Sequence, residues 1–135
     1  MEEQKMKIPE IGLVICNSGS SNTGALTGTA AMKIVEELGE KVGICSLPAL
    51  VNNVPRQINL VKKIPYLIVV DGCHNECAKK ILEKIGIKIG AYINIEYDLG
   101  IKKIGPFTTL QYSPSEAYSV YSLILKRIKE RELLK

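Results

Sequence analysis

Residues 11–24 read IGLVICNSGSSNTG, and this stretch indicates the class of the fold. Residues 11–16 are mostly apolar and β-branched, as a buried strand of a parallel sheet should be, and a Gly- and Ser-rich loop follows at once. Residues 24–38 then carry apolar side chains at helical spacing and stop at Gly39, a residue that suits a helix end. A strand, a loop and a helix in this order predict an α/β protein.

The same alternation continues along the chain. Further strands are predicted at residues 42–47, 66–70 and 91–95. Helices are predicted from Asn53 to before Pro65, over residues 75–86, and over residues 113–131, where Ser113, Pro114 and Glu116 form a capping box. We therefore expect one domain over residues 1–135, a three-layer Rossmann-like or flavodoxin-like fold. Its mainly parallel four-stranded sheet has the strand order 2-1-3-4 and carries helices on both faces.

The charge and the aromatic content of the chain bear on whether it binds nucleic acid. The formal net charge of +4 comes from 18 basic and 14 acidic residues, and only 5% of residues are aromatic. Several lysines stand beside glutamates at helical spacing, which is typical of solvated helix faces, so we expect no nucleic-acid partner. The sequence does not indicate an oligomeric state. Tyr112, Tyr118 and Tyr121 near the last helix suit either a modest interface or the core.

The amino-terminal residues 1–10 are charged and are expected to be flexible, and they do not resemble a secretory signal. No apolar run approaches the roughly 20 residues of a membrane span, so no membrane partner and a cytoplasmic location are expected. The composition, rich in Ile, Lys and Glu, is typical of a thermophile, in which intracellular disulfides also occur.

The four cysteines are the strongest functional signal. Cys16, Cys45 and Cys73 each fall at or just after the carboxyl end of a predicted strand, and Cys77 follows one helical turn after Cys73. Adjacent strand ends lie about 4.8 Å apart, so thiols at one sheet edge can converge. Tetrahedral zinc is commonly held by four cysteine thiolates. The sequence therefore predicts one zinc ion per chain, bound by all four cysteines.

Other uses of these thiols remain open. Cys73 and Cys77 near a helix amino terminus would suit a thiol-based redox enzyme, with His74 as a candidate proton shuttle or replacement ligand. Four cysteines also suit an iron–sulfur protein. Alternatively, cysteines at strand ends are simply small buried apolar residues or form disulfides.

The residues around the cysteines have structural explanations. The loop of residues 17–24 supplies backbone amides that favour thiolates. It lacks the Gly-Lys-Ser/Thr, G-x-G-x-x-G and C-x5-R signatures of phosphate sites, so a capping loop is the better interpretation. Asp71 is expected to cap the helix that follows it. Glu96 and Asp98 are assigned no catalytic role.

Four separate segments resemble the DGC-domain family. They are CNSGSSNTGALTGTAA at residues 16–31, CSLPA at 45–49, DGC at 71–73 continuing to CAKK at 77–80, and LGIKK at 99–103. The resemblance runs from about residue 11 to 103 and implies a small domain without an established activity. It implies Cys16, Cys45, Cys73 and Cys77 as zinc ligands. His74, where relatives commonly have Pro, and residues 46–48, where an Ala-Gly segment is usual, depart from the family pattern.

Overall fold

The computed structural model describes residues 7–134. Residues 1–6, which make up most of the amino-terminal segment expected to be flexible, lie outside the described part. The elements are β1 (Ile11–Ile15), α1 (Asn22–Leu38), the 3-10 turn η1 (Gly39–Lys41), β2 (Val42–Ile44), α2 (Leu47–Val51), α3 (Pro55–Lys63), β3 (Tyr66–Asp71), α4 (Cys77–Lys84), β4 (Ala91–Asn94), α5 (Ile95–Leu99) and α6 (Pro114–Leu133).

The sheet confirms the predicted topology. Its four strands are all parallel and lie in the order β2-β1-β3-β4, so the first strand of the chain is central. The pairing of β1 with β3 covers the full length of β1, from Ile11 opposite Tyr66 to Ile15 opposite Val70. The chain crosses from β1 to β2 on one face and from β2 to β3 on the other, which creates the crevice expected at a switch in strand order.

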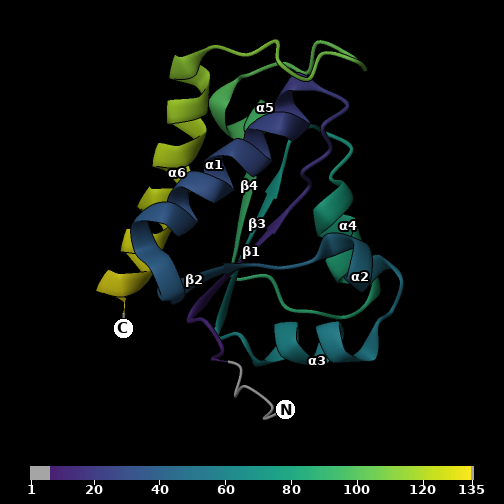
Figure 1. Ribbon diagram of the computed structural model, residues 1–135, viewed down its shortest axis with the longest axis vertical. Helices are drawn as coiled ribbons and strands as arrows, with labels where there is room; N and C mark the ends of the chain where they lie inside the picture. Colours follow the sequence, from purple (N-terminus) through teal and green to yellow (C-terminus); the bar gives the residue numbers. More distant parts are fainter. Residues whose placement is uncertain (1–6, 135) are drawn as a thin grey trace, which may run out of the picture.

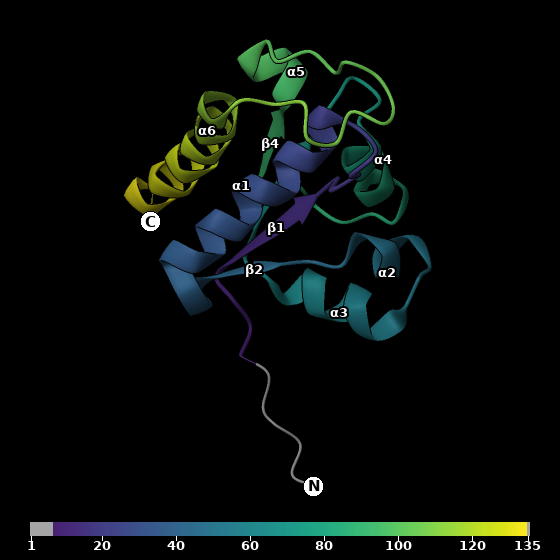
Figure 2. The same ribbon diagram turned by 45° about the horizontal axis from the view of Figure 1, so that its top comes forward.

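Helices cover both faces of this sheet, as Figures 1 and 2 show. On one face, α1 and α6 pack over Leu13 and Ile15. On the other face, α2, α3 and α4 pack over Val14 and Val69. Each fully buried side chain of this size contributes about 1.5–3 kcal/mol to folding. The two cores together form the expected three-layer α/β domain.

The helix ends follow local sequence rules where these are strong. The hydroxyl of Ser113 accepts the N–H of Glu116, and the Glu116 carboxylate accepts the N–H of Ser113, so the predicted capping box is present. Helix α1 begins two residues before the predicted start because Ser21 caps it, and it ends at the predicted Gly39. None of the helices within residues 7–134 is both long and apolar enough to cross a membrane.

Several boundaries differ from the prediction, and two short helices were not predicted. Strand β2 ends at Ile44, not at residue 47, because Ser46 caps α2 through the N–H of Ala49. Asn53 does not cap α3; it has φ of +54°, and Val54 occupies the cap position.

Helix α4 begins at Cys77 and not near residue 75, because Glu76 has φ of +55° and interrupts the helical path. Helix α5 is the second unpredicted helix. It begins directly after β4, where the Asn94 side chain accepts the N–H groups of Glu96 and Tyr97. Its five residues are too few to show a helical repeat in the sequence.

The tyrosines near α6 divide between the core and the surface. Tyr121 is buried and its hydroxyl donates to Glu37 on α1, whereas Tyr118 is 62% exposed and Tyr112 is partly buried. Lys33 of α1 lies over both the Tyr118 and the Tyr121 rings, with its Nζ 5.8 and 4.7 Å from the ring centres. Tyr121 therefore belongs to the contact between α1 and α6.

The loop between β1 and α1 passes so close to the helix that it requires glycine at residue 24. A Cβ on Gly24 would stand 1.9 Å from the carbonyl oxygen of Ser18. Because this neighbour is backbone, the loop itself would have to move to make room.

We expect Gly24→Ala to lower the free energy of unfolding by about 2–3 kcal/mol, since overpacking at a rigid site costs this much. Gly19→Ala in the same loop is the matched control, because a Cβ there meets nothing within 4 Å. Urea unfolding followed by circular dichroism measures both. Equal stability of the two variants would contradict the close approach.

Candidate functional site

The carboxyl edge of the sheet carries three of the four cysteines on the face covered by α2, α3 and α4. Cys16 extends β1 by one residue, because its N–H donates to the carbonyl of Val70 at 2.9 Å. It stands two residues after Val14, which packs on this face, so alternation along the strand turns both side chains the same way. Cys45 packs against the same core. Cys77 is the first residue of α4, which covers this face.

Cys16 lies in a polar environment that acts on its charge in opposite ways. Burial raises the pKa of its thiol, and negative charge on Asp71 and Cys77 raises this pKa further. The backbone N–H groups of Ser18 and Gly72 donate to its sulfur and act in the opposite direction. A negative charge on Cys77, which is far from Cys16 in the sequence, thus also disfavours the thiolate of Cys16.

The loop before α1 uses its amides within the protein. The N–H of Asn17 donates to the Thr27 hydroxyl at 2.8 Å, and the N–H of Asn22 donates to the Thr108 hydroxyl at 3.0 Å. The N–H of Gly24 is taken up by the Ser21 cap. The loop thus serves as a capping loop, which also turns the Ser18 N–H toward Cys16, and these three amides are not free to hold a phosphate.

Asp71, the last residue of β3, joins the sheet to α4. Its side chain is 1% exposed, and its two carboxylate oxygens accept the N–H of Ala78 at 2.8 Å and the N–H of Lys79 at 3.0 Å. The hydroxyl of Tyr92 donates to the same carboxylate at 3.0 Å. Burial raises the pKa of Asp71, and these three donors oppose the shift. The expected helix cap is present, and it also holds β4 through Tyr92.

The turn between Asp71 and α4 carries Cys73 and Cys77. The Cys73 carbonyl accepts the N–H of Glu76 at 3.2 Å and the Asn94 side-chain amide at 2.8 Å. Cys73 is half-buried, whereas Cys77 is exposed at the first position of α4. The amide of Asn94 therefore anchors the backbone of this turn to the end of β4.

His74 stands on the solvent side of the same turn. Its backbone N–H and its ring Nδ1 both contact one Glu96 oxygen, at 2.9 and 3.0 Å, and the second Glu96 oxygen accepts the N–H of Lys103. Burial alone would raise the pKa of Glu96, but the hydrogen bonds from His74 and Lys103 outweigh it and lower this pKa. The Glu96 carboxylate therefore links the turn of His74 to the segment of Lys103. Asp98 accepts the N–H of Asn94, so both acids have structural partners.

Cys45 differs from the other three cysteines because its surroundings are mainly apolar. It lies behind Gly12 of β1, where an added Cβ would stand 3.1 Å from its sulfur. It also lines a hollow of about 240 Å³ beside Leu60 and Val61 of α3. Burial raises the pKa of the Cys45 thiol to about 11. Burial therefore disfavours the thiolate form of Cys45.

The four thiols share an edge of the sheet without being gathered into one cluster. All four cysteines are free. Within residues 7–134, no group of three or more His, Cys, Asp or Glu side chains is placed so that it could hold a metal ion. The register of β1 and β2 ends with Leu13 opposite Ile44, so Cys45 comes one residue after this pair on the β2 side, whereas Cys16 comes three residues after it on the β1 side. Two strand residues span about 6.6 Å, which separates these two positions along the sheet.

Sequence reasoning did not find Tyr92 and Asn94. Both lie on β4 and connect the turn of Cys73 to Asp71, since the Asn94 amide also donates to the Tyr92 hydroxyl at 3.1 Å. The available signal was a polar residue, Asn94, ending an apolar strand at the same edge as the cysteines. The Cys73 carbonyl that Asn94 contacts is 21 residues away in the chain, so the residues next to Asn94 in the sequence do not indicate this contact.

In the metal-free protein we expect Cys45 to react slowest with iodoacetamide and Cys77 fastest, because only thiolates react and Cys77 is exposed. The rate at Cys45 should rise with pH up to a midpoint near 11. Mass spectrometry of quenched digests gives the rate at each site. Equal rates for Cys45 and Cys77 at pH 8 would show that Cys45 is not buried as described.

The chain matches a family of proteins over most of its length. The family model of the DGC domain matches residues 13–124, which include all four cysteines, Asp71 and Asn94. No curated protein and no solved structure matches the chain. Since the match covers most of its length, the chain belongs to the DGC domain family.

Proposed function

We propose that the protein binds one zinc ion through Cys16, Cys45, Cys73 and Cys77. The observation that carries this proposal is the position of all four cysteines at the carboxyl edge of the sheet, directly after β1 and β2, in the turn after β3, and at the start of α4. Cys73 belongs to the same turn as Cys77, and Cys45 faces the same side of the sheet. Four thiolates are a donor set that zinc prefers.

The surroundings of Cys16 support a thiolate-bound metal. Four thiolates around a divalent ion leave a net charge of −2, which N–H donors must offset. The N–H groups of Ser18 and Gly72 already donate to the Cys16 sulfur, and the amino end of α4 adds its partial positive charge beside Cys77. The buried carboxylate of Asp71 acts against ionisation of Cys16, so a positive ion at this place would relieve an unfavourable interaction.

Because the four thiols are not gathered into one cluster within residues 7–134, binding one zinc ion through all of them requires some of these side chains to move. The part most able to move is the exposed rim of the turn, where His74 and Cys77 face solvent. Cys45 is the cysteine least able to move toward the others, since it packs against the core beside α3. If Cys45 stays in place, three thiols and an open position remain, which is the arrangement of a catalytic zinc site.

We expect the reduced protein to carry one zinc per chain by native mass spectrometry and elemental analysis. Cys16→Ser, Cys73→Ser and Cys77→Ser should each lower zinc affinity by about 100-fold or more and remove the rise in melting temperature that zinc produces, because binding contributes to folding. Competition with a chromophoric chelator measures the affinity. Ser20→Ala, a change in the neighbouring loop at an exposed residue, is the control.

The result for Cys45→Ser distinguishes the two ligand sets. A loss equal to the others supports four ligands, and an unchanged affinity supports three. Absence of zinc at micromolar concentration in the wild type, with four titratable thiols, would contradict the proposal. Visible colour with iron in the elemental analysis would instead indicate an iron–sulfur protein.

A second candidate is a thiol redox pair. Cys16 with Cys77 joins the Cys73 and Cys77 pair considered from the sequence as a candidate, because a charge on Cys77 acts on the Cys16 thiol. Oxidised glutathione would accept the two electrons and be released as two thiols, and the protein would lose two hydrogens. A disulfide between Cys16 and Cys77 in a tryptic digest, with a reduction potential in the range of catalytic dithiols, would support this candidate over zinc.

Asn94 offers a test of how the turn is held. We expect Asn94→Ala to lower zinc affinity by about 10–100-fold although every thiol remains, because partners outside the ligand set orient the ligands. Asn75→Ala is the matched control, since Asn75 is exposed on the same turn. An Asn94→Ala protein that is folded and binds zinc normally would show that the contact of the Asn94 amide with the Cys73 carbonyl does not position the ligands.

A further inference from the structure

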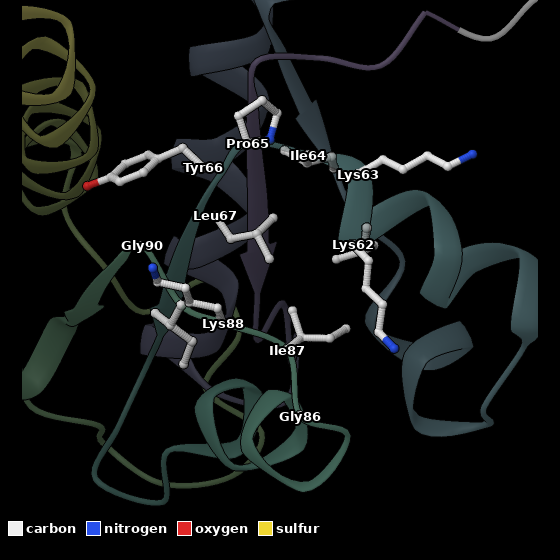
Figure 3. A pocket seen from close by; sticks show the side chains of 12 residues that line it. Lys62, Lys63, Ile64, Pro65, Tyr66, Leu67, Gly86, Ile87, Lys88 and Gly90 are labelled. Carbon is white, nitrogen blue, oxygen red and sulfur yellow. The ribbon is translucent and has the colours of Figure 1, made fainter. Parts of the chain in front are cut away.

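A hollow lies at the end of the sheet opposite the carboxyl ends of the strands. It has a volume of about 640 Å³ and is formed where α3 ends, β3 begins and the chain passes from α4 to β4. Two continuous segments line it, residues 61–67 and residues 86–90 (Figure 3). Pockets that hold small molecules commonly have volumes of about 300–1,000 Å³.

The floor of this pocket is apolar and built on the fold. Leu67 and Ile87 are 3% and 7% exposed, and Figure 3 shows them at the centre of the pocket. The second segment is fixed at both ends, because the N–H of Ile87 donates to the Leu82 carbonyl at 3.0 Å and the N–H of Gly90 donates to the Leu67 carbonyl at 2.8 Å. The floor is therefore part of the core.

The rim of the pocket carries charge of one sign. Lys62, Lys63 and Lys88 are the charged residues among those that line it, and no carboxylate from residues 7–134 does so. No ion pair is found for these three lysines in the described part of the chain. A cleft lined by charge of one sign attracts ligands of the opposite charge.

Neighbouring residues keep this end of the sheet positive. The guanidinium of Arg131 on α6 lies over the ring of Tyr66, 5.1 Å from its centre. Because Tyr66 lines the pocket, a fourth cation is close to it. The glutamates near this end, Glu10, Glu40 and Glu132, line a different hollow. The positive charge at the pocket is thus not balanced by acids within it.

We propose that this pocket binds a small organic anion with an apolar body. The apolar part would cover Leu67 and Ile87, and the anionic group would lie at the rim. Figure 3 shows the lysine side chains extending from the rim in different directions, so they attract an anion as flexible point charges and do not form a fixed clamp. No cysteine lines the pocket, although Val61 and Ile64 also border the hollow beside Cys45, and the inference does not depend on zinc binding.

The test uses two fluorescent probes with the same rings, 8-anilinonaphthalene-1-sulfonate, which is anionic, and N-phenyl-1-naphthylamine, which is neutral. We expect the anionic probe to bind one site per chain, more weakly at high salt because exposed charges are screened. The triple variant Lys62→Gln, Lys63→Gln and Lys88→Gln should bind it about tenfold or more weakly. The neutral probe should bind both proteins alike.

The matched control is the triple variant Lys80→Gln, Lys102→Gln and Lys126→Gln. It removes the same charge from exposed lysines that do not line the pocket, and it should change the affinity of the anionic probe less than twofold. Amide chemical shifts of the wild type with the anionic probe should move within residues 61–67 and 86–90. Equal losses in the two triple variants, shifts confined to other residues, or no saturation at millimolar probe would overturn the proposal.

Discussion

The buried carboxylate of Asp71 connects three elements that would otherwise meet only at their ends. It terminates β3, accepts the first free N–H groups of α4 from Ala78 and Lys79, and receives the hydroxyl of Tyr92 from β4. A buried charge is tolerated only when hydrogen-bond donors surround it. The Asp71 carboxylate therefore needs these three donors, and its hydrogen bonds in turn fix the position of α4 and Tyr92. This group fixes where α4 starts, and with the Asn94 and Glu96 contacts it sets the position of the turn with Cys73 and Cys77.

A second set of contacts closes the same edge from the side of α1. The Asn22 side chain donates to the Lys102 carbonyl at 2.9 Å and accepts the N–H of Ile104 at 2.9 Å, and its backbone N–H is taken by Thr108. The long connection between α5 and α6 is thereby fixed over the loop that follows β1, as Figure 1 shows at the top of the molecule. The cysteine edge is consequently bordered by ordered backbone on both sides, while Cys77 and His74 remain open to solvent.

The two ends of the sheet differ in chemistry for a topological reason. In a parallel sheet, every strand ends at one edge, where the loops lead into helices and polar side chains such as Asp71 and Asn94 collect. At the other edge, the chain returns from the helices, and here lysines at the end of α3 and before β4 surround an apolar floor. The proposed zinc site and the proposed anion pocket therefore stand on opposite ends of the same strands and share β3.

The amino-acid sequence alone was sufficient for the α/β class, the strand order and the placement of the cysteines at strand ends, because these follow from apolar periodicity and from the right-handed crossovers of parallel strands. It was also sufficient for the Ser113 capping box, whose signal lies within four residues. The tertiary structure was needed for features made by residues distant in the chain. Examples are the helix start at Cys77, which follows from the backbone of Glu76, and the contact of the Asn94 amide with the Cys73 carbonyl. Side-chain spacing reports which face a residue occupies, but the depth of Cys45 and its distance from Cys16 depend on register and burial, which arise only when the strands pair.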